Sequence, residues 1–290
     1  MLELGASSVG EIGGGHTLGG GGQDYLYIPH AIRERTGVEL QPAQARKLKV
    51  AVLSRYIDLD AYDAAAVEAA MREVGINDRM SVEELKTLIC DCVLPSIQIG
   101  LDAFTEAAQV GVRYNQPSIY HNSAPSMKRM LDITQKYPRI IAGHSNHPSF
   151  EISESLELAK QLRAEGGIID IATIDCFFAK KLCDTTESFT AFYGAGLVDI
   201  ISTDYAAGLW DSVLCALDLV VKQGKASLEY AVATATGNVV AAIPNLAPNL
   251  GILACGKTAD IILVDQNDMS KVRRVIIGGK TVVKDGKLTV

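Results

Sequence analysis

The sequence predicts an α/β fold, in which parallel strands alternate with helices, followed by a short all-β segment. Between residues 111 and 248, short apolar runs alternate with amphipathic helical segments, which is typical of parallel strands joined by right-handed crossovers. Residues 249–290 instead alternate between apolar and polar positions around glycine turns, which is the pattern of an antiparallel sheet. Three predicted strands also end in polar side chains, and this favours a functional site at one edge of the parallel sheet.

Length and composition limit the classes of function. A chain of 290 residues with 48% hydrophobic and 21% charged residues is typical of a soluble globular protein of one large domain, with or without an appendage. No apolar run approaches the ~18–20 residues of a membrane span, and the N-terminus does not resemble a signal peptide. The net charge of −7 and the single Trp disfavour a nucleic-acid surface. We expect a cytoplasmic protein with a small-molecule substrate, with neither membrane nor nucleic acid as a partner.

The opening of the chain, residues 1–22, allows two interpretations. In VGEIGGGHTLGGGG a strand runs into glycines, so this stretch could cradle a phosphate group, or Glu11 could be a metal ligand at a strand end. A dinucleotide loop needs a helix directly after its glycines and an acidic residue ~20 positions further on. The segment QDYLYIPH that follows has no helical period, which favours the metal-ligand interpretation.

Residues 23–110 are predicted to form a helical insertion that ends in a crossover helix. The segments QPAQARKLKVAVLSRYI, DAAAVEAAMREVGI and SVEELKTLICDCVLPSIQIGLDAFTEAAQVG are amphipathic. Ser81 stands three residues before Glu84, the spacing of a capping box at a helix start.

Strands and helices alternate through residues 111–248. The strand-like runs are SIYH (118–121), RIIAGH (139–144), GIIDIATID (167–175) and LVDIISTD (197–204). Helical patterns lie between them, as in SAPSMKRMLDITQKY and SESLELAKQLRAEGG.

His121, His144 and Asp204 stand at the ends of three of these runs. Two imidazoles and a carboxylate suit zinc, iron or manganese and leave coordination positions open for water. Each residue alone has a structural explanation, since a strand-end histidine is often a satisfied polar residue and Asp204 could cap a following helix. Together, the three are harder to explain by packing.

These residues and the C-terminal segment resemble the amidohydrolase superfamily of metal-dependent barrel hydrolases. The clearest part is YAVATATGNVVAAIPNLAPNLGILACGKTADIILVDQNDMSKVRRVIIGGKTVVKDGK, with its GILACGKTADI turn and its VIIGGKTV hairpin. The resemblance implies a partial TIM-like (β/α)8 barrel, with strand 4 in residues 1–22 and strands 5 to 8 in residues 111–248. Residues 249–290 would be the C-terminal part of a small β-sandwich, in which Gly278 and Gly279 form a hairpin turn.

The resemblance also implies roles for single residues. His121 is similar to the metal ligand that ends barrel strand 5, and His144 to the ligand that ends strand 6. Asp204, in STDYAAG, resembles the strand 8 aspartate that binds metal or takes a proton from the attacking water. Glu11 stands at the strand 4 position, which in many members is a carboxylated lysine and in others a glutamate. The local sequence is most similar to enamidase-like members, which hydrolyse cyclic amides.

The implied activity is metal-dependent hydrolysis of a C–N bond in an amide or cyclic amide. One or two divalent ions are expected, zinc before iron or manganese, with Glu11 as the bridging carboxylate. Asp204 would bind metal and pass a proton to the leaving nitrogen. His16, His147 and Tyr205 are candidates for substrate contact, although His147 could also serve only to shape its loop.

One departure from the family concerns the missing H-x-H pair, which closes barrel strand 1 in complete members. None of the chain's five histidines precedes Glu11, so strands 1 to 3 are absent. We expect an oligomer in which a second polypeptide supplies strands 1 to 3 and H-x-H, although processing or truncation would look the same.

Two alternatives remain: an inactive scaffold or regulatory subunit, and a deaminase of the same fold. The segment YHNSAPS lacks the acid typical of one-metal deaminases, which disfavours the second.

Overall fold

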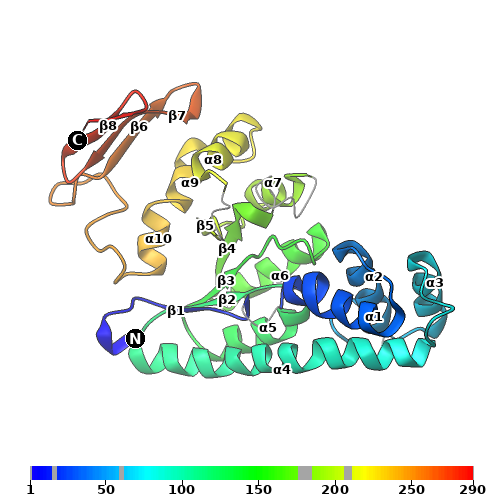
Figure 1. Cartoon of the computed structure of the whole chain (residues 1–290). Coiled ribbons are helices and arrows are strands. Elements are labelled where there is room, and N and C mark those ends of the chain that lie inside the picture. The colour runs from blue at the N-terminus through cyan, green and yellow to red at the C-terminus, as the bar shows by residue number, and fades with distance from the viewer. Residues whose placement is uncertain (1, 15–17, 59–61, 176–184, 206–210, 290) are drawn as a thin grey trace.

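The structure, a computed structural model, describes residues 2–14, 18–58, 62–175, 185–205 and 211–289. Its described strands form a five-stranded parallel sheet and a four-stranded antiparallel sheet. Figure 1 shows the parallel sheet at the centre of the molecule, a long helix below it, and the antiparallel sheet at the far end beside the C-terminus. The predicted α/β fold with a C-terminal antiparallel sheet is therefore confirmed.

The parallel sheet follows the order of its strands in the chain. Its strands are β1 (Val9–Ile12), β2 (Ser118–His121), β3 (Ile140–Gly143), β4 (Ile168–Ala172) and β5 (Ile200–Ser202). Each strand pairs in parallel with the next, from β1 through to β5. The four strand-like runs of residues 118–204 therefore form neighbouring strands, and β1 joins them across the helical segment.

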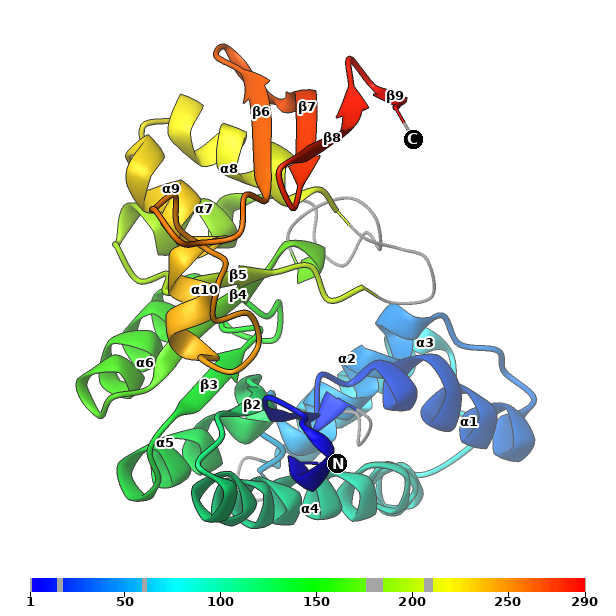
Figure 2. The ribbon, with the colours of Figure 1, turned by 90° about the vertical axis from the view of Figure 1, so that its left-hand side faces the viewer.

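Helices cover the outer face of this sheet. They are α5 (Met127–Lys136), α6 (Ile152–Ala164) and α7 (Glu187–Gly194). Short 3-10 turns lie elsewhere in the chain, at Leu2–Leu4, Ala124–Ser126 and Thr173–Asp175. Helix α4 packs against α5, α5 against α6 and α6 against α7, and Figure 2 shows α4, α5 and α6 following one another around the outside of the strands. On this face Tyr120 of β2 is fully buried, with its ring centroid 4.9 Å from that of Phe104.

The inner face of the sheet is partly covered by the end of the helical segment after β5. This segment comprises α8 (Val213–Lys222), α9 (Leu228–Thr234) and α10 (Gly237–Ala242). Ile141 of β3 and Ile200 of β5 form a small buried cluster with Ala242 and Ile243. Because successive strand residues face opposite sides, these isoleucines point away from the outer helices.

Most of the described residues between 23 and 114 are helical. A π-helical turn (Gln23–Tyr27) leads into α1 (Ile28–Thr36), followed by α2 (Pro42–Leu53), α3 (Ala64–Val74) and α4 (Val82–Tyr114). The expectation that QDYLYIPH is not helical was therefore wrong. Tyr25, Leu26 and Tyr27 are exposed although apolar, which hides the helical period, and the buried face begins only with Ile28 and Ile32.

Helix α4 begins with the predicted capping box. The Glu84 amide donates to Ser81 Oγ (3.3 Å), and the Ser81 amide donates to Glu84 Oε2 (2.7 Å). One 18-residue window of α4 has a mean hydropathy of 1.4 and is 33% buried. Length and composition alone would let this helix cross a membrane, but the core helix of a soluble protein passes the same test. In the structure α4 packs against β1 and β2.

The antiparallel sheet is an ordered meander. Its strands are β6 (Ile261–Asp265), β7 (Asp268–Ile277), β8 (Lys280–Lys284) and β9 (Lys287–Leu288). Gly278 and Gly279 have φ angles of 54° and 80°, as a tight two-residue hairpin turn requires, so the predicted turn is confirmed. The sheet is attached to α8, where the buried Met269 donates its amide to Asp218 Oδ1 (3.0 Å).

Candidate metal centre

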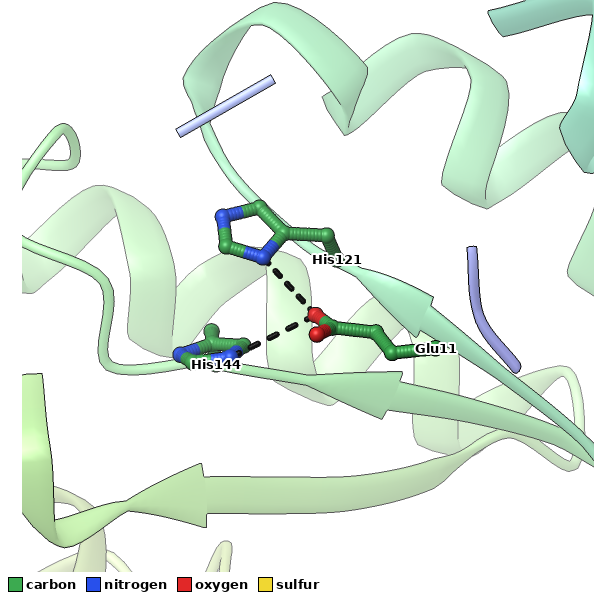
Figure 3. Close-up of side chains that lie close together, drawn as sticks. All are labelled: Glu11, His121 and His144. Carbon is green, nitrogen blue, oxygen red and sulfur yellow. Dashed lines mark hydrogen bonds and ion pairs between the residues drawn. The ribbon is translucent and has the colours of Figure 1, made fainter. Parts of the chain in front are cut away.

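Glu11, His121 and His144 lie together at the carboxyl edge of the parallel sheet. Glu11 is on β1, His121 ends β2, and His144 directly follows β3, where its neighbour Gly143 is in register with His121. Glu11 Oε1 lies 2.7 Å from His121 Nδ1 and 3.3 Å from His144 Nε2. Figure 3 shows both rings pointing at the carboxylate. One ligand atom from each residue lies within 4.8 Å of the other two, so these three residues form a trio.

The glycines next to Glu11 allow this close approach. A Cβ on Gly10 would lie 2.4 Å from the carbonyl oxygen of Ile119, and Gly10 also has a left-handed φ of 124°. A Cβ on Gly13 would lie 2.5 Å from the Leu18 side chain, at a φ of 101°. Any other residue would be strained at both positions. These glycines therefore allow close packing of the chain around Glu11.

Electrostatics keep Glu11 ionised. Burial alone would raise the pKa of Glu11, but the hydrogen bonds and charges of His121 and His144 outweigh it and hold this pKa well below its usual range. An ionised carboxylate can only accept hydrogen bonds. A ring nitrogen that donates to Glu11 carries a proton. A metal ion at the trio would have to displace that proton, because it binds the nitrogen lone pair.

The trio fits a divalent ion. Two imidazoles and one carboxylate are a common zinc ligand set that leaves a position for substrate. Ligand atoms about 2.0–2.2 Å from an ion at tetrahedral angles lie about 3.3–3.5 Å apart. The separation of 3.3 Å between Glu11 and His144 meets this spacing, whereas Glu11 and His121, at 2.7 Å, must move apart by several tenths of an ångström. His121 Nε2 is buried without a hydrogen-bond partner in the part of the chain that the structure describes.

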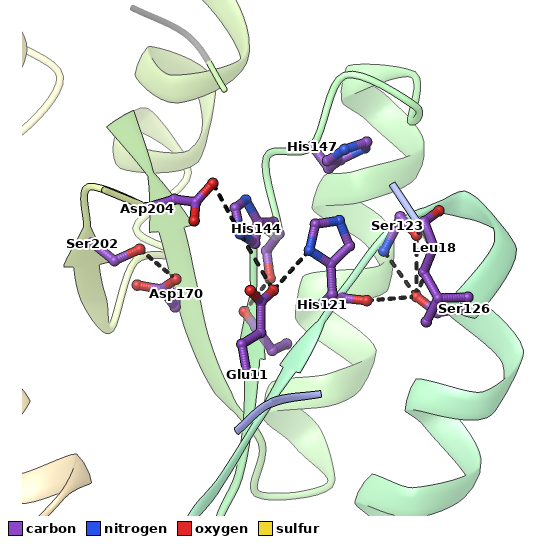
Figure 4. Close-up of polar contacts among 12 residues, drawn as sticks. Glu11, Leu18, His121, Ser123, Ser126, His144, His147, Asp170, Ser202 and Asp204 are labelled. Atoms are coloured by element: carbon purple, nitrogen blue, oxygen red, sulfur yellow. Dashed lines mark hydrogen bonds and ion pairs between the residues drawn. The ribbon is translucent and has the colours of Figure 1, made fainter. Parts of the chain in front are cut away.

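Asp204 lies at the border of the trio. It follows β5, and its Oδ2 is 3.9 Å from His144 Nε2, with a third of its side chain exposed. Figure 4 shows its carboxylate directed toward His144. It does not cap α8, because Ser212 is the N-cap of that helix and accepts from the Cys215 amide. Asp204 has a φ of 46° and His144 a φ of 58°, and such left-handed non-glycine residues are concentrated at functional sites.

Asp170 was missed by the sequence analysis. It lies on β4 with 5% of its surface exposed, and its Oδ2 accepts from Ser202 Oγ (2.9 Å), while Oδ1 has no partner among the described residues. Burial raises the pKa of Asp170 to about 7, although the nearby His144 opposes the shift. An aspartate within the apolar run GIIDIATID was the signal that could have identified it, since acids are rarely buried without a reason.

Of the three residues predicted to contact the substrate, the structure places His147 beside the trio and leaves Tyr205 exposed. The His147 ring centroid lies 5.3 Å from that of His121. Its Nδ1 accepts from the Ser149 amide (3.1 Å) and lies 2.8 Å from Ser149 Oγ, so His147 shapes its loop and also borders the trio. Tyr205 is 67% exposed. His16 lies outside the described residues.

The loop that carries Gly19 is held by hydrogen bonds beside His121 and His147. The Ser123 hydroxyl donates to the Leu18 carbonyl (3.0 Å), and the Ser126 hydroxyl donates to the His121 carbonyl (3.0 Å), as Figure 4 shows. A Cβ on Gly19 would lie 2.6 Å from His121 Nε2 and 3.0 Å from His147 Nε2. The backbone of residue 19 therefore lies close to the Nε2 atoms of two imidazole rings.

Gly19→Ala is expected to lower zinc affinity by roughly tenfold or more, because misorientation of a ligand ring has effects of about 10–100-fold. The added methyl group forces the His121 ring to move. Gly21→Ala is the matched control, since a Cβ there meets nothing within 4 Å and neither glycine has a left-handed φ. Zinc competition titrations of both variants provide the measurement. Equal affinities for the two would show that His121 does not hold the ion.

Comparisons with known proteins place this fold. No known family profile matches the sequence, and no curated protein matches it. Among solved structures, an L-hydantoinase (dihydropyrimidinase) from Arthrobacter aurescens matches with a TM-score of 0.50 and 15% identity, over 65% of this chain and 61% of the hydantoinase. A beta-aspartyl dipeptidase from Fervidobacterium islandicum AW-1, in complex with beta-Asp-Leu dipeptide, gives 0.47 and 22%, over 70% of this chain and 54% of the dipeptidase.

An adenosine deaminase from Xanthomonas campestris with bound zinc also matches, with a TM-score of 0.43 and 13% identity, over 85% of this chain and 70% of the deaminase. At these identities the likeness shows the fold alone. Of the three matches, the one to the hydantoinase, with a TM-score of 0.50, supports this fold. The predicted resemblance is thus confirmed for the fold. The chain spans 54% and 61% of the lengths of the dipeptidase and the hydantoinase.

Proposed function

We propose that this chain belongs to a metal-dependent hydrolase that cleaves a C–N bond of an amide or cyclic amide. The trio of Glu11, His121 and His144, at the carboxyl edge of a parallel sheet, carries the proposal. Active sites of parallel barrels gather at this edge. The fold is similar to that of an L-hydantoinase, but fold alone leaves the chemistry open, so the trio carries the proposal.

In this proposal the five parallel strands are strands 4 to 8 of a (β/α)8 barrel. Strand 4 lies in residues 1–22, residues 23–110 are an insertion, and residues 111–248 hold strands 5 to 8. Residues 249–290 are one part of a small β-sandwich. Both edge strands of the parallel sheet, β1 and β5, pair with one strand each among the described residues, as expected of a barrel opened at two places.

The proposed roles follow from position. Glu11, His121 and His144 would hold one or two divalent ions, zinc before iron or manganese. A bound ion would supply positive charge that polarises the carbonyl group and lowers the pKa of water toward ~7. Asp204, beside His144 and partly exposed, would accept the proton of the attacking water and give it to the leaving nitrogen. His147, Tyr205 and His16 would contact the substrate.

We also propose that strands 1 to 3, with their H-x-H pair, come from a second polypeptide. The antiparallel sheet leaves Ile262, Ile277 and Leu288 more than half exposed, and exposed apolar residues on a sheet mark an association surface. Unpaired strand edges of a parallel sheet favour association in the same way. An interface that closed both sheets would bury on the order of 2,000 Å² or more.

Purified alone, the chain is expected to lack turnover on hydantoin, dihydrouracil and linear amides, because the H-x-H ligands are absent from it. Turnover should appear when zinc and a co-encoded polypeptide with H-x-H are added, and should be lost with a chelator. Full activity of the isolated chain would refute the second polypeptide. If the assembled complex binds no metal, the chain is a scaffold or regulatory subunit.

A further inference from the structure

A pocket of about 110 Å³ lies next to the trio. It is formed between α2, the loop that carries Gly19 and Gly20, and the loops that follow β2 and β3. Gly19, Lys49, Arg55 and His147 are among the residues that line it. Because the Gly19 backbone lies against both His121 Nε2 and His147 Nε2, the pocket and the trio share a wall.

The lining is positively charged. Arg46, Lys49 and Arg55 line the pocket, and Asp24 is the one acid among its described lining residues. Asp24 is buried, with its carboxylate 2.6 Å from Lys49 Nζ and 2.9 Å from Arg46 Nε. Arg46 and Lys49 thus share one carboxylate, which leaves one positive charge between them. Arg55 is paired with Glu154 (3.2 Å) and Glu151 (3.6 Å), which both lie outside the lining.

An unused donor is also buried in this wall. Gln23 is 1% exposed and lines the pocket. Its Oε1 accepts from Lys49 Nζ (3.1 Å), while its Nε2 has no hydrogen-bond partner among the described residues. The contact with Lys49 fixes the orientation of the amide, because the opposite orientation would set two donors against each other. A buried donor without a partner is costly, and a ligand acceptor would satisfy it.

The backbone near these groups permits the arrangement only with glycine. A Cβ on Gly20 would lie 2.7 Å from Lys49 Nζ and 3.2 Å from Asp24 Oδ2, and Gly20 has a φ of 88°. The ion pair of Lys49 and Asp24 therefore occupies space that any side chain at position 20 would fill. Asp24 in turn holds Arg46 and Lys49 side by side, so that the cations are fixed before a ligand arrives.

We propose that this pocket binds a carboxylate group of the substrate, so that the substrate is an acidic amide. The carboxylate would accept from Gln23 Nε2 and lie among Arg46, Lys49 and Arg55, while the amide bond lies at the trio across Gly19. That the substrate is an amide, and that this amide lies at the trio, rests on the proposed function, whereas the carboxylate site does not. A neutral substrate would leave buried donors unpaired, which is the strongest basis for rejecting an analogue.

The test uses succinamate, which carries an amide and a carboxylate, and its neutral counterpart succinamide. Calorimetric titration of the metal-free full chain at constant ionic strength should show succinamate binding roughly tenfold or more tighter than succinamide. Inorganic phosphate is a third probe. Equal binding of the first two probes, tighter binding of phosphate, or no binding of any probe would overturn the proposal.

Variants locate the binding. Arg46→Gln removes a partly exposed cation while Lys49 still pairs with Asp24, and it should weaken succinamate binding by roughly fivefold or more. Arg55→Gln provides a second variant if the first does not fold. Arg72→Gln, on α3 and paired with Glu68 at 3.0 Å, is the matched control and should change nothing. A similar loss in the Arg72 variant would refute the site.

The titrations also separate this proposal from the proposed function. Succinamate binding needs no metal, so it would persist if the trio bound no zinc. Conversely, an assembled zinc enzyme that hydrolysed neutral and acidic amides equally would retain its proposed function and lose the carboxylate pocket.

Discussion

Replacement of Glu11 by glutamine is expected to lower zinc affinity by roughly tenfold or more, since even partners that only orient a ligand are worth about 10–100-fold. Glu11 Oε1 is the atom that both His121 Nδ1 and His144 Nε2 approach. Glutamine keeps the length of the side chain but removes the negative charge that faces a dication. Elemental analysis after dialysis measures zinc per chain, and circular dichroism follows the fold.

Glu3→Gln is the matched control for this variant. Glu3 accepts from the Tyr114 hydroxyl (2.8 Å), so it is another hydrogen-bonded glutamate close to β1. Its replacement should leave zinc affinity unchanged. An unchanged zinc content in Glu11→Gln would remove Glu11 from the ligand set, and a loss confined to nucleotide binding would restore the phosphate-loop interpretation.

The strands of the parallel sheet could be predicted from the sequence because they are buried. A strand covered on both faces is a short, nearly continuous apolar run, and the run RIIAGH contains β3, Ile140–Gly143, in which every residue is buried. The polar residues at the ends of these runs stand out for the same reason. Parallel pairing then brings His121 and His144 to one edge of the sheet, since Gly143 is in register with His121.

The placement of Glu11 could not be derived in the same way. It is separated from His121 by 110 positions, and only the resemblance to a family put it on the neighbouring strand. The physical reason became visible in the structure, where Gly10 lies against Ile119 of β2. Local periodicity contains no information about such a contact between distant segments.

Two features were hidden by their surroundings. The helix that begins at Gln23 was missed because Tyr25 and Leu26 are apolar but exposed, and the turn is held by ion pairs of Asp24 with α2. Asp170 was missed because it stands inside an apolar strand run. In both cases a buried aspartate, Asp24 or Asp170, is fixed by tertiary contacts. The amphipathic pattern of a single segment contains no information about such contacts.

Asp204→Asn is expected to lower turnover of the assembled enzyme by ~10²–10⁴-fold, because asparagine cannot accept a proton at neutral pH. Zinc content should fall only modestly, since Asp204 Oδ2 is 3.9 Å from His144 Nε2 and outside the trio. The melting temperature should be nearly unchanged. Asparagine tolerates the left-handed backbone of residue 204, whose φ is 46°, and Ser212 rather than Asp204 caps α8.

Ser212→Ala is the complementary control, because it removes that cap and should reduce stability by about 1 kcal/mol without affecting the chemistry. Asp204→Asn should therefore lower steady-state turnover and leave thermal unfolding nearly unchanged, and Ser212→Ala should do the opposite. If Asp204→Asn kept near-normal turnover and lowered the melting temperature instead, Asp204 would be a structural residue. The proton would then need another acceptor, and Asp170, whose buried carboxyl has a pKa raised to about 7, would be the next residue to replace.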